Sequence, residues 1–255
     1  MITQQIRIDY RMTFDAAFHM GTGLRNGLIH RTVNRDSDGY LFIPGSTVKG
    51  VVRDLCSQTA MLFGFSPDDP HAAGSAEASP SSTIIELIFG SRFRPGRLFF
   101  DDAMLTDEDR ELFEPPHHDP FMRDRHRAEF RGWQTEKRTQ VSIWRPTGSA
   151  QAGRLYNTEY GIRGLRFDGR ITGSLEGYAT LTTPPTNYSL ILLLAGLYSV
   201  TRIGANKSNG LGSLAVEVHR LTVDGQVVES TQLLNELEQL EFEWYKMVLE
   251  EENPS

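Results

Sequence analysis

The most informative stretch of the sequence is FIPGSTVKGVVR, residues 42–53. Pro44-Gly45 is a turn signal, and the hydroxyl residues Ser46 and Thr47 that follow it suit a helix N-cap. Apolar side chains then recur at helical spacing, which predicts a helix from Val48 to Leu62.

The start of this helix carries chemistry suited to phosphate. Lys49 and Arg53 lie four residues apart and therefore share one helix face. Unpaired backbone N–H groups, two hydroxyl groups and two cations together would bind an anion at this position. A well-capped surface helix with solvated charges is the alternative interpretation.

The segments on either side predict the fold class. Residues 6–14 alternate between apolar and polar side chains, as in a half-buried strand, and residues 189–200 are apolar all round, as in a buried helix. Further strands are expected at 97–103, 170–178 and 214–218. The order strand, loop, helix, strands, helix, glycine loop, strand predicts an α+β fold with a ferredoxin-like βαββαβ core and long insertions.

The glycine-rich loop IGANKSNGLGSL, residues 203–214, is a second candidate binding element. Its glycines let the backbone approach a ligand closely, while Arg202 and Lys207 supply positive charge. It matches neither common phosphate-binding fingerprint, because Lys207 lies inside the loop and the loop precedes a strand. A simple turn before that strand is the alternative.

The third candidate is the basic, turn-rich segment 139–161, which contains Arg145, Arg154 and Tyr156. Aromatic rings stack on bases while arginines hold phosphates, so this composition suits single-stranded RNA. An exposed hairpin that packs its aromatic residues on its own core is the alternative.

The charge distribution is compatible with an RNA partner although the net charge of the 255 residues is −7. Residues 226–255 carry eight acids and one base, so the first 225 residues are neutral overall. Residues 131–170 carry eight bases and three acids, and a polyanion responds to this local field rather than to the average.

Other features narrow the protein class. The longest apolar run, 190–197, is too short to span a membrane, and no secretory signal is expected at the N-terminus. The single cysteine, Cys56, cannot form an internal disulfide, which indicates a reducing, cytoplasmic location. No metal site is predicted, because the neighbouring His117 and His118 lack a second ligand set.

Taken together, the motifs resemble the RAMP superfamily of CRISPR-associated proteins, and most closely the backbone, Cas seven-type, subunit of type III effector complexes. The resemblance covers most of residues 5–220. It rests on residues 42–53, on LIFGSRFRPGRLFFDDA (87–103), on the glycine loop, and on 140–160, which is similar to the family's thumb hairpin.

This resemblance implies a fold, a function and a set of contacts. The fold is an RRM-like, ferredoxin-like domain over residues 1–225 with a thumb-like segment at 138–165. The composition of the sequence, rather than the resemblance, predicts a mobile loop at 65–82, an insertion at 105–135 and an acidic helix or tail at 226–255. Copies stack along a guide RNA (crRNA), which they bind mainly through its backbone while base pairing reads the target RNA. The implied RNA-binding residues are Ser46, Thr47, Lys49, Arg53, Arg145, Arg154, Tyr156, Arg202, Gly204, Asn206, Lys207 and Ser208.

The implied partners are crRNA, target RNA, further copies or homologous RAMP subunits, the large polymerase/cyclase-like subunit, the five-type subunit and small subunits, with no membrane partner. Binding requires no cofactor. Slicing members cut target RNA with a metal ion, Mg²⁺ or Mn²⁺, near a loop aspartate. Here His30 occupies the place of that aspartate and Asp36 follows, so these two are the candidate catalytic residues of an endoribonuclease. A repeat-RNA processing endoribonuclease is a further alternative.

Overall fold

The computed structural model describes the chain except for residues 24–30, 63–83, 93–94, 117–119, 181–184 and 236–255. It mixes helices and antiparallel strands, in agreement with the α+β class. The elements in chain order are β1 (Ile2–Phe14), β2 (Phe42–Ile43), α1 (Gly45–Leu62), α2 (Ile84–Phe89), β3 (Leu98–Phe100), β4 (Ala103–Leu105), α3 (Asp107–Leu112), α4 (Pro120–Gly132), β5 (Thr135–Trp144), β6 (Ser149–Gly161), β7 (Arg166–Gly177), α5 (Tyr188–Tyr198), the 3₁₀ turn η1 (Lys207–Asn209), β8 (Leu214–Val223), β9 (Gln226–Val228) and α6 (Ser230–Leu234).

One large sheet organises the described part of the chain. Its strand order is β2-β4-β7-β1-β8-β9, with β3 also paired to β7, and neighbouring strands are antiparallel. The alternation predicted for residues 6–14 is confirmed, because β1 buries every second side chain. The buried side chains of β1 are Ile6, Ile8, Tyr10, Met12 and Phe14.

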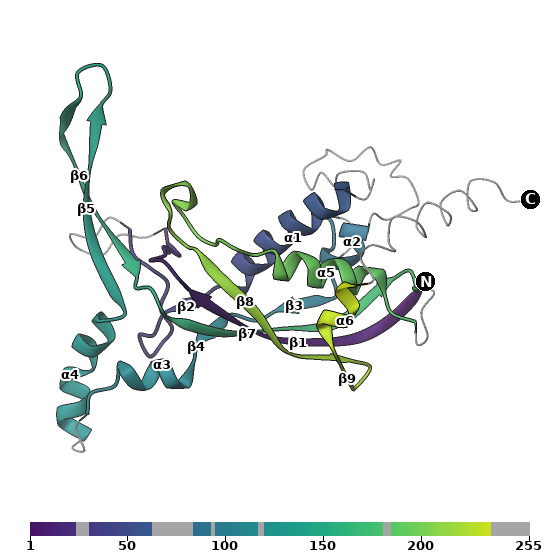
Figure 1. Ribbon diagram of the computed structural model, residues 1–255. Coiled ribbons are helices and arrows are strands. Elements are labelled where there is room, and N and C mark those ends of the chain that lie inside the picture. The colour runs from purple at the N-terminus through teal and green to yellow at the C-terminus, as the bar shows by residue number, and fades with distance from the viewer. Residues whose placement is uncertain (24–30, 63–83, 93–94, 117–119, 181–184, 236–255) are drawn as a thin grey trace, which may run out of the picture.

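Helices α1 and α5 contact each other and cover one face of the sheet (Figure 1). Helix α5 is buried from Tyr188 to Leu197, which explains why its sequence is apolar all round. Cys56 of α1 is buried against α5, where its Sγ donates to the carbonyl of Leu192 over 3.3 Å. No helix in the described ranges is both long enough and apolar enough to cross a bilayer.

A second, two-stranded sheet projects from the molecule (Figure 1). Strands β5 and β6 pair from Thr135–Gly161 to Trp144–Ser149, with an irregularity between Val141 and Ile143. This hairpin occupies the position of the expected thumb-like segment 138–165, although it begins three residues earlier. The turn-rich composition of this segment predicts the hairpin turn, whereas the ends of the two strands are set by how far they pair with each other.

Several expectations need correction. Helix α1 begins at Gly45, so Ser46 and Thr47 lie inside it and are not its N-cap. The sequence of the insertion 105–135 has no clear hydrophobic period and predicts no helix, yet this segment contains α3 and α4. Strand β9 pairs with β8, and Leu233 of α6 joins the core, so the folded body continues beyond the expected boundary at residue 225. The loop predicted at 65–82 lies outside the described residues.

Candidate nucleic-acid interface

The start of α1 is built against the linker between β3 and β4. The Gly45 N–H donates to Oδ1 of Asp102 over 2.7 Å, so a carboxylate from a distant segment caps the helix. Glycine is required at this position because a Cβ would lie 2.0 Å from the carbonyl oxygen of Phe100. The Pro-Gly turn therefore sets how closely α1 approaches the sheet.

The two predicted cations of α1 differ in their surroundings. Lys49 is half-buried, with its Nζ 6.0 Å from the centroid of the Phe100 ring, and burial together with nearby Arg53 lowers the pKa of Lys49. Arg53 Nη1 donates to the carbonyl of Gly90 over 3.1 Å, so part of its guanidinium supports the fold. The exposed hydroxyl of this segment is that of Ser46, while Thr47 is half-buried.

The glycine-rich loop uses the conformational freedom of its glycines, since Gly204, Gly210 and Gly212 all have positive φ. Gly204 has a φ of +95° and passes close to the carbonyl of His19, where a Cβ would lie 2.7 Å from that oxygen. Asn206 is left-handed at a φ of 59° and precedes η1. Lys207 and Ser208 are exposed, and Arg202 Nη1 donates to the carbonyl of Lys207 over 2.8 Å.

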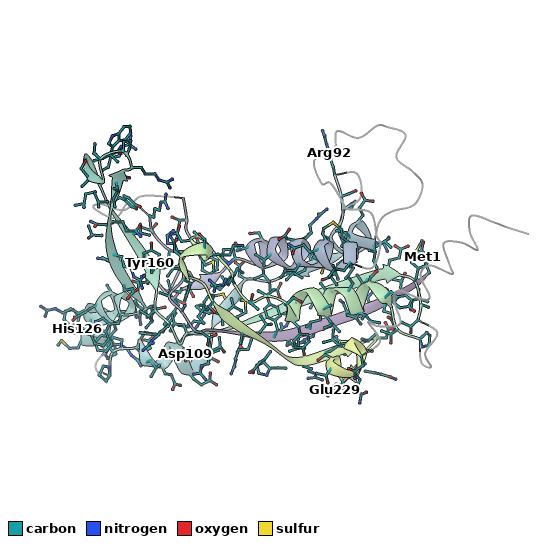
Figure 2. The ribbon with its side chains drawn as sticks, turned by 45° about the horizontal axis from the view of Figure 1, so that its top comes forward. Met1, Arg92, Asp109, His126, Tyr160 and Glu229 are labelled. Carbon is teal, nitrogen blue, oxygen red and sulfur yellow. The ribbon has the colours of Figure 1, made fainter. Side chains whose placement is uncertain are left out.

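The segment 17–21 joins the glycine-rich loop to the base of the hairpin. On one side, Gly212 N donates to the carbonyl of Ala17 over 2.9 Å and Ala205 N donates to that of His19 over 3.0 Å. On the other side, Phe18 and Gly161 exchange two backbone hydrogen bonds. In Figures 1 and 2 the loop before β8 accordingly lies between the hairpin and α1.

The outer part of the hairpin is exposed and combines cations with apolar side chains. Arg145 and Arg154 are exposed, and Tyr156 is half-buried with the guanidinium of Arg31 6.0 Å from its ring centroid. The exposed large apolar side chains of the hairpin are Val141, Ile143, Trp144 and Leu155. These aromatic and apolar groups do not pack on the core, so the alternative interpretation of this segment is wrong for its outer half.

The base of the hairpin is fixed by an ion pair that the sequence does not reveal. Glu159 accepts from Arg35 Nη2 and from the Thr135 hydroxyl, each over 2.8 Å, and from the Val33 N–H over 3.3 Å. Burial opposes ionisation of this carboxyl, but the hydrogen bonds from Arg35 and Thr135 outweigh it and hold its pKa below the usual value. Arg35 and Glu159 are 124 residues apart, so no local motif could indicate the contact.

Replacing Glu159 with glutamine is expected to lower the free energy of unfolding at pH 7 by about 2 kcal/mol, because Arg35 loses its buried counter-charge. The folded-state pKa of Glu159 is lowered, so its stabilisation is present above about pH 4.5 and is lost as the pH falls through the folded-state pKa. Urea denaturation at pH 7 and at lower pH measures this. The difference between wild type and Glu159→Gln should shrink in acid, whereas the exposed control Glu217→Gln should change little at any pH. A pH-independent difference would contradict the assignment.

The structure describes only one of the two candidate catalytic residues, Asp36. His30 lies outside the described residues. Asp36 organises the loop before β2: its Oδ1 accepts from the N–H groups of Asp38 and Tyr40, and its Oδ2 accepts from Arg110 over 3.4 Å. Within the described ranges, no three His, Cys, Asp or Glu side chains group together as a metal site. Catalysis by either residue stays a prediction.

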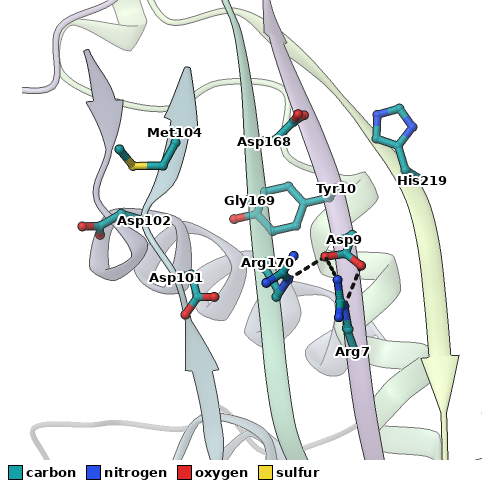
Figure 3. Close-up of a pocket in the computed structure, with 10 residues that line it drawn as sticks. All are labelled: Arg7, Asp9, Tyr10, Asp101, Asp102, Met104, Asp168, Gly169, Arg170 and His219. Atoms are coloured by element: carbon teal, nitrogen blue, oxygen red, sulfur yellow. Dashed lines mark hydrogen bonds and ion pairs between the residues drawn. The ribbon is translucent and has the colours of Figure 1, made fainter. Parts of the chain in front are cut away.

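A pocket of about 550 Å³ lies on the sheet and contains none of the predicted RNA-binding residues (Figure 3). Asp9 forms ion pairs with Arg7 over 2.8 Å and with Arg170 over 2.7 Å beside it. Tyr10 is buried, and its hydroxyl finds no hydrogen-bond partner among the described residues. Burial and the charge of Asp101 raise the Tyr10 pKa, so the phenol stays neutral. The lining also includes Asp101, Asp102 and Asp168, so carboxylates outnumber the two arginines and the pocket does not offer a basic surface for RNA.

A family model described as the RAMP superfamily matches residues 11–215. The chain belongs to the RAMP superfamily. The match covers the end of β1, all of α1, the hairpin and the glycine-rich loop, and it confirms the resemblance of the motifs.

Further comparisons bear on the fold of this RAMP protein. No curated protein sequence matches it. Among solved structures, a similar chain occurs in the cryo-EM structure of the type III-B Cmr-beta bound to cognate target RNA. The two chains are 12% identical and superpose with a TM-score of 0.56, covering 83% of this chain and 96% of that one. At this identity the likeness shows a shared fold.

Proposed function

We propose that this RAMP protein is a guide-RNA (crRNA)-binding backbone subunit of a type III CRISPR effector complex, which recognises complementary target RNA in antiviral defence. The observation that carries the proposal is the hydrogen-bonded connection of the glycine-rich loop, segment 17–21 and the hairpin, with the loop lying between the hairpin and α1. Membership of the RAMP superfamily supports it, as does the likeness to a chain from a type III-B complex bound to target RNA.

The available groups suit binding that is independent of base sequence. Lys49 and Lys207 carry charge toward a phosphate, and the loop around Gly204 offers backbone close to the surface. Contacts to phosphate and sugar fix the register of an RNA but carry no base information. Base pairing between guide and target then supplies the specificity, so one protein serves many guides.

The hairpin would act on the bases rather than on the phosphates. Ile143, Trp144 and Leu155 are 52–62% exposed at its outer end. Apolar and aromatic side chains stack on unpaired bases, and Arg145 and Arg154 would hold the adjacent phosphates. The hairpin would thus separate neighbouring nucleotides at the position of each copy.

The proposal extends to fold, partners and location. Strands β1, β3–β4, β7 and β8 with helices α1 and α5 would form the ferredoxin-like βαββαβ core, because their spatial order is β8-β1-β7-β3 with both helices on one face. Partners would be crRNA, target RNA, the other type III subunits and further copies of the chain, in the cytoplasm. Target cleavage with Mg²⁺ or Mn²⁺ is not part of the proposed function, because the described contacts of Asp36 stabilise its own loop. Repeat processing is not part of it either.

The proposal is tested by native co-expression of the full chain with its neighbouring subunits and a repeat array. The complex should co-purify with a short guide RNA, and Lys49→Glu with Arg53→Glu should lose it. Arg7→Glu, an equal type of change on a strand residue paired to Asp9, is the control and should retain the RNA. A stable complex that elutes free of nucleic acid would contradict the proposal.

A further inference from the structure

Helix α4 carries an exposed surface that the proposed function does not use. Arg123, His126, Arg127 and Phe130 recur at helical spacing and therefore share one side of the helix. The Phe130 ring lies 4.1 Å from that of Trp133, which is 52% exposed. We call these five residues the α4 face.

The α4 face has positive charge available for a partner. Within α4, whose residues are all described, Arg131 is the one buried side chain. Arg127 pairs with Asp124 over 3.2 Å and His126 lies 3.6 Å from Glu129, whereas Arg123 makes no ion pair with another described residue. Four arginines against two acids leave the helix basic, with an aromatic pair at its end.

The C-terminal sequence has the complementary chemistry. Residues 236–252 contain seven glutamates and one lysine. Leu237, Leu240 and Trp244 recur at helical spacing, and Glu236 and Glu241 flank that stripe. A sequence of this kind offers an apolar ridge bordered by carboxylates, which matches aromatic rings bordered by arginines in both polarity and charge.

The positions of the two elements favour contact between different copies. Helix α4, marked by His126, lies at one end of the molecule, whereas α6, just after Glu229, lies towards the other (Figure 2). Helix α6 ends at Leu234, two residues before the acidic segment begins, so the chain enters that segment towards the end of the molecule opposite the α4 face of the same copy. We propose that the α4 face binds the acidic C-terminal segment of a second copy of this chain.

This contact is heterologous, because each copy would use a different surface at each end. It would arrange copies head to tail, and it requires no RNA. The aromatic pair Phe130–Trp133 offers apolar area that the Leu and Trp side chains of the acidic segment can cover, while Arg123 and Arg127 face its carboxylates. The inference therefore goes beyond the proposed function.

The test is sedimentation of the full-length, nuclease-treated protein over a range of concentrations. Wild type should associate with increasing concentration. Arg123→Glu/Arg127→Glu and Glu236→Arg/Glu241→Arg should each weaken association at least about tenfold, because like charges then face each other. Combining the four substitutions should restore association to within about threefold of wild type.

The matched control is Arg7→Glu/Arg11→Glu, which makes the same charge change on β1 and should leave association unchanged. Circular dichroism of each variant verifies folding. The inference is overturned if wild type stays monomeric, if the combined variant does not recover, or if the α4 reversal leaves association unchanged.

Discussion

Gly45→Ala is expected to destabilise the protein by about 3–4 kcal/mol. A Cβ at this position would lie 2.0 Å from the carbonyl oxygen of Phe100 and 2.9 Å from the carbonyl carbon of Asp101. Both atoms belong to backbone, so relief requires α1 to move away from the sheet. That movement also strains the 2.7 Å hydrogen bond from the Gly45 N–H to Asp102.

The same substitution five residues later in α1 is the control. A Cβ at Gly50 meets nothing within 4 Å, and the residue is exposed. Alanine has the better helix propensity, so Gly50→Ala should stabilise the protein by about 0.5–1 kcal/mol. Urea denaturation measures both variants, and similar changes in the two would contradict the packing described for the start of α1.

The second large effect is expected on RNA affinity. Lys49→Glu combined with Lys207→Glu should weaken binding of a short single-stranded RNA at least about 100-fold, because two phosphate contacts become repulsive. With alanine at both positions, the slope of log affinity against log salt should fall by about 1.4, since each contact to a single strand contributes about 0.7. Fluorescence anisotropy at several salt concentrations measures both quantities.

The control for this prediction is Arg7→Ala. Arg7 belongs to β1 and pairs with Asp9, and it is exposed between the buried residues Ile6 and Ile8, on the opposite face of the strand from the core. Its removal should change the affinity by less than about twofold and the salt slope by less than about 0.7, the contribution of one contact to a single strand. A salt slope that Arg7→Ala lowers as much as the lysine substitutions do would show that charge acts non-specifically.

The sequence predicts most of the fold where a single face of an element decides its structure. The alternation in β1 and the apolar run of α5 identify both elements, because burial against one layer leaves a simple period. The break between β3 and β4 at Asp101 and Asp102 leaves no such pattern. Those residues are exposed to solvent and act through backbone and capping contacts with other segments.

The sequence also predicts those parts of the candidate interface that have a local pattern of residues. Lys49 and Lys207 stand out because glycine, hydroxyl and basic residues cluster around them locally. Glu159 and Arg35 do not, because a partly buried ion pair between distant residues has no local signature. The contacts that fix the base of the hairpin are therefore visible only in the folded protein.

Crosslinking by ultraviolet light of the RNA-bound complex, followed by mass spectrometry of the protein, tests the central claim most directly. The account predicts crosslinked peptides from the start of α1, from the loop 203–212 and from the outer part of the β5–β6 hairpin. Crosslinks confined to the ion-paired sheet surface around Arg7 and Arg170, with none in those three segments, would contradict it.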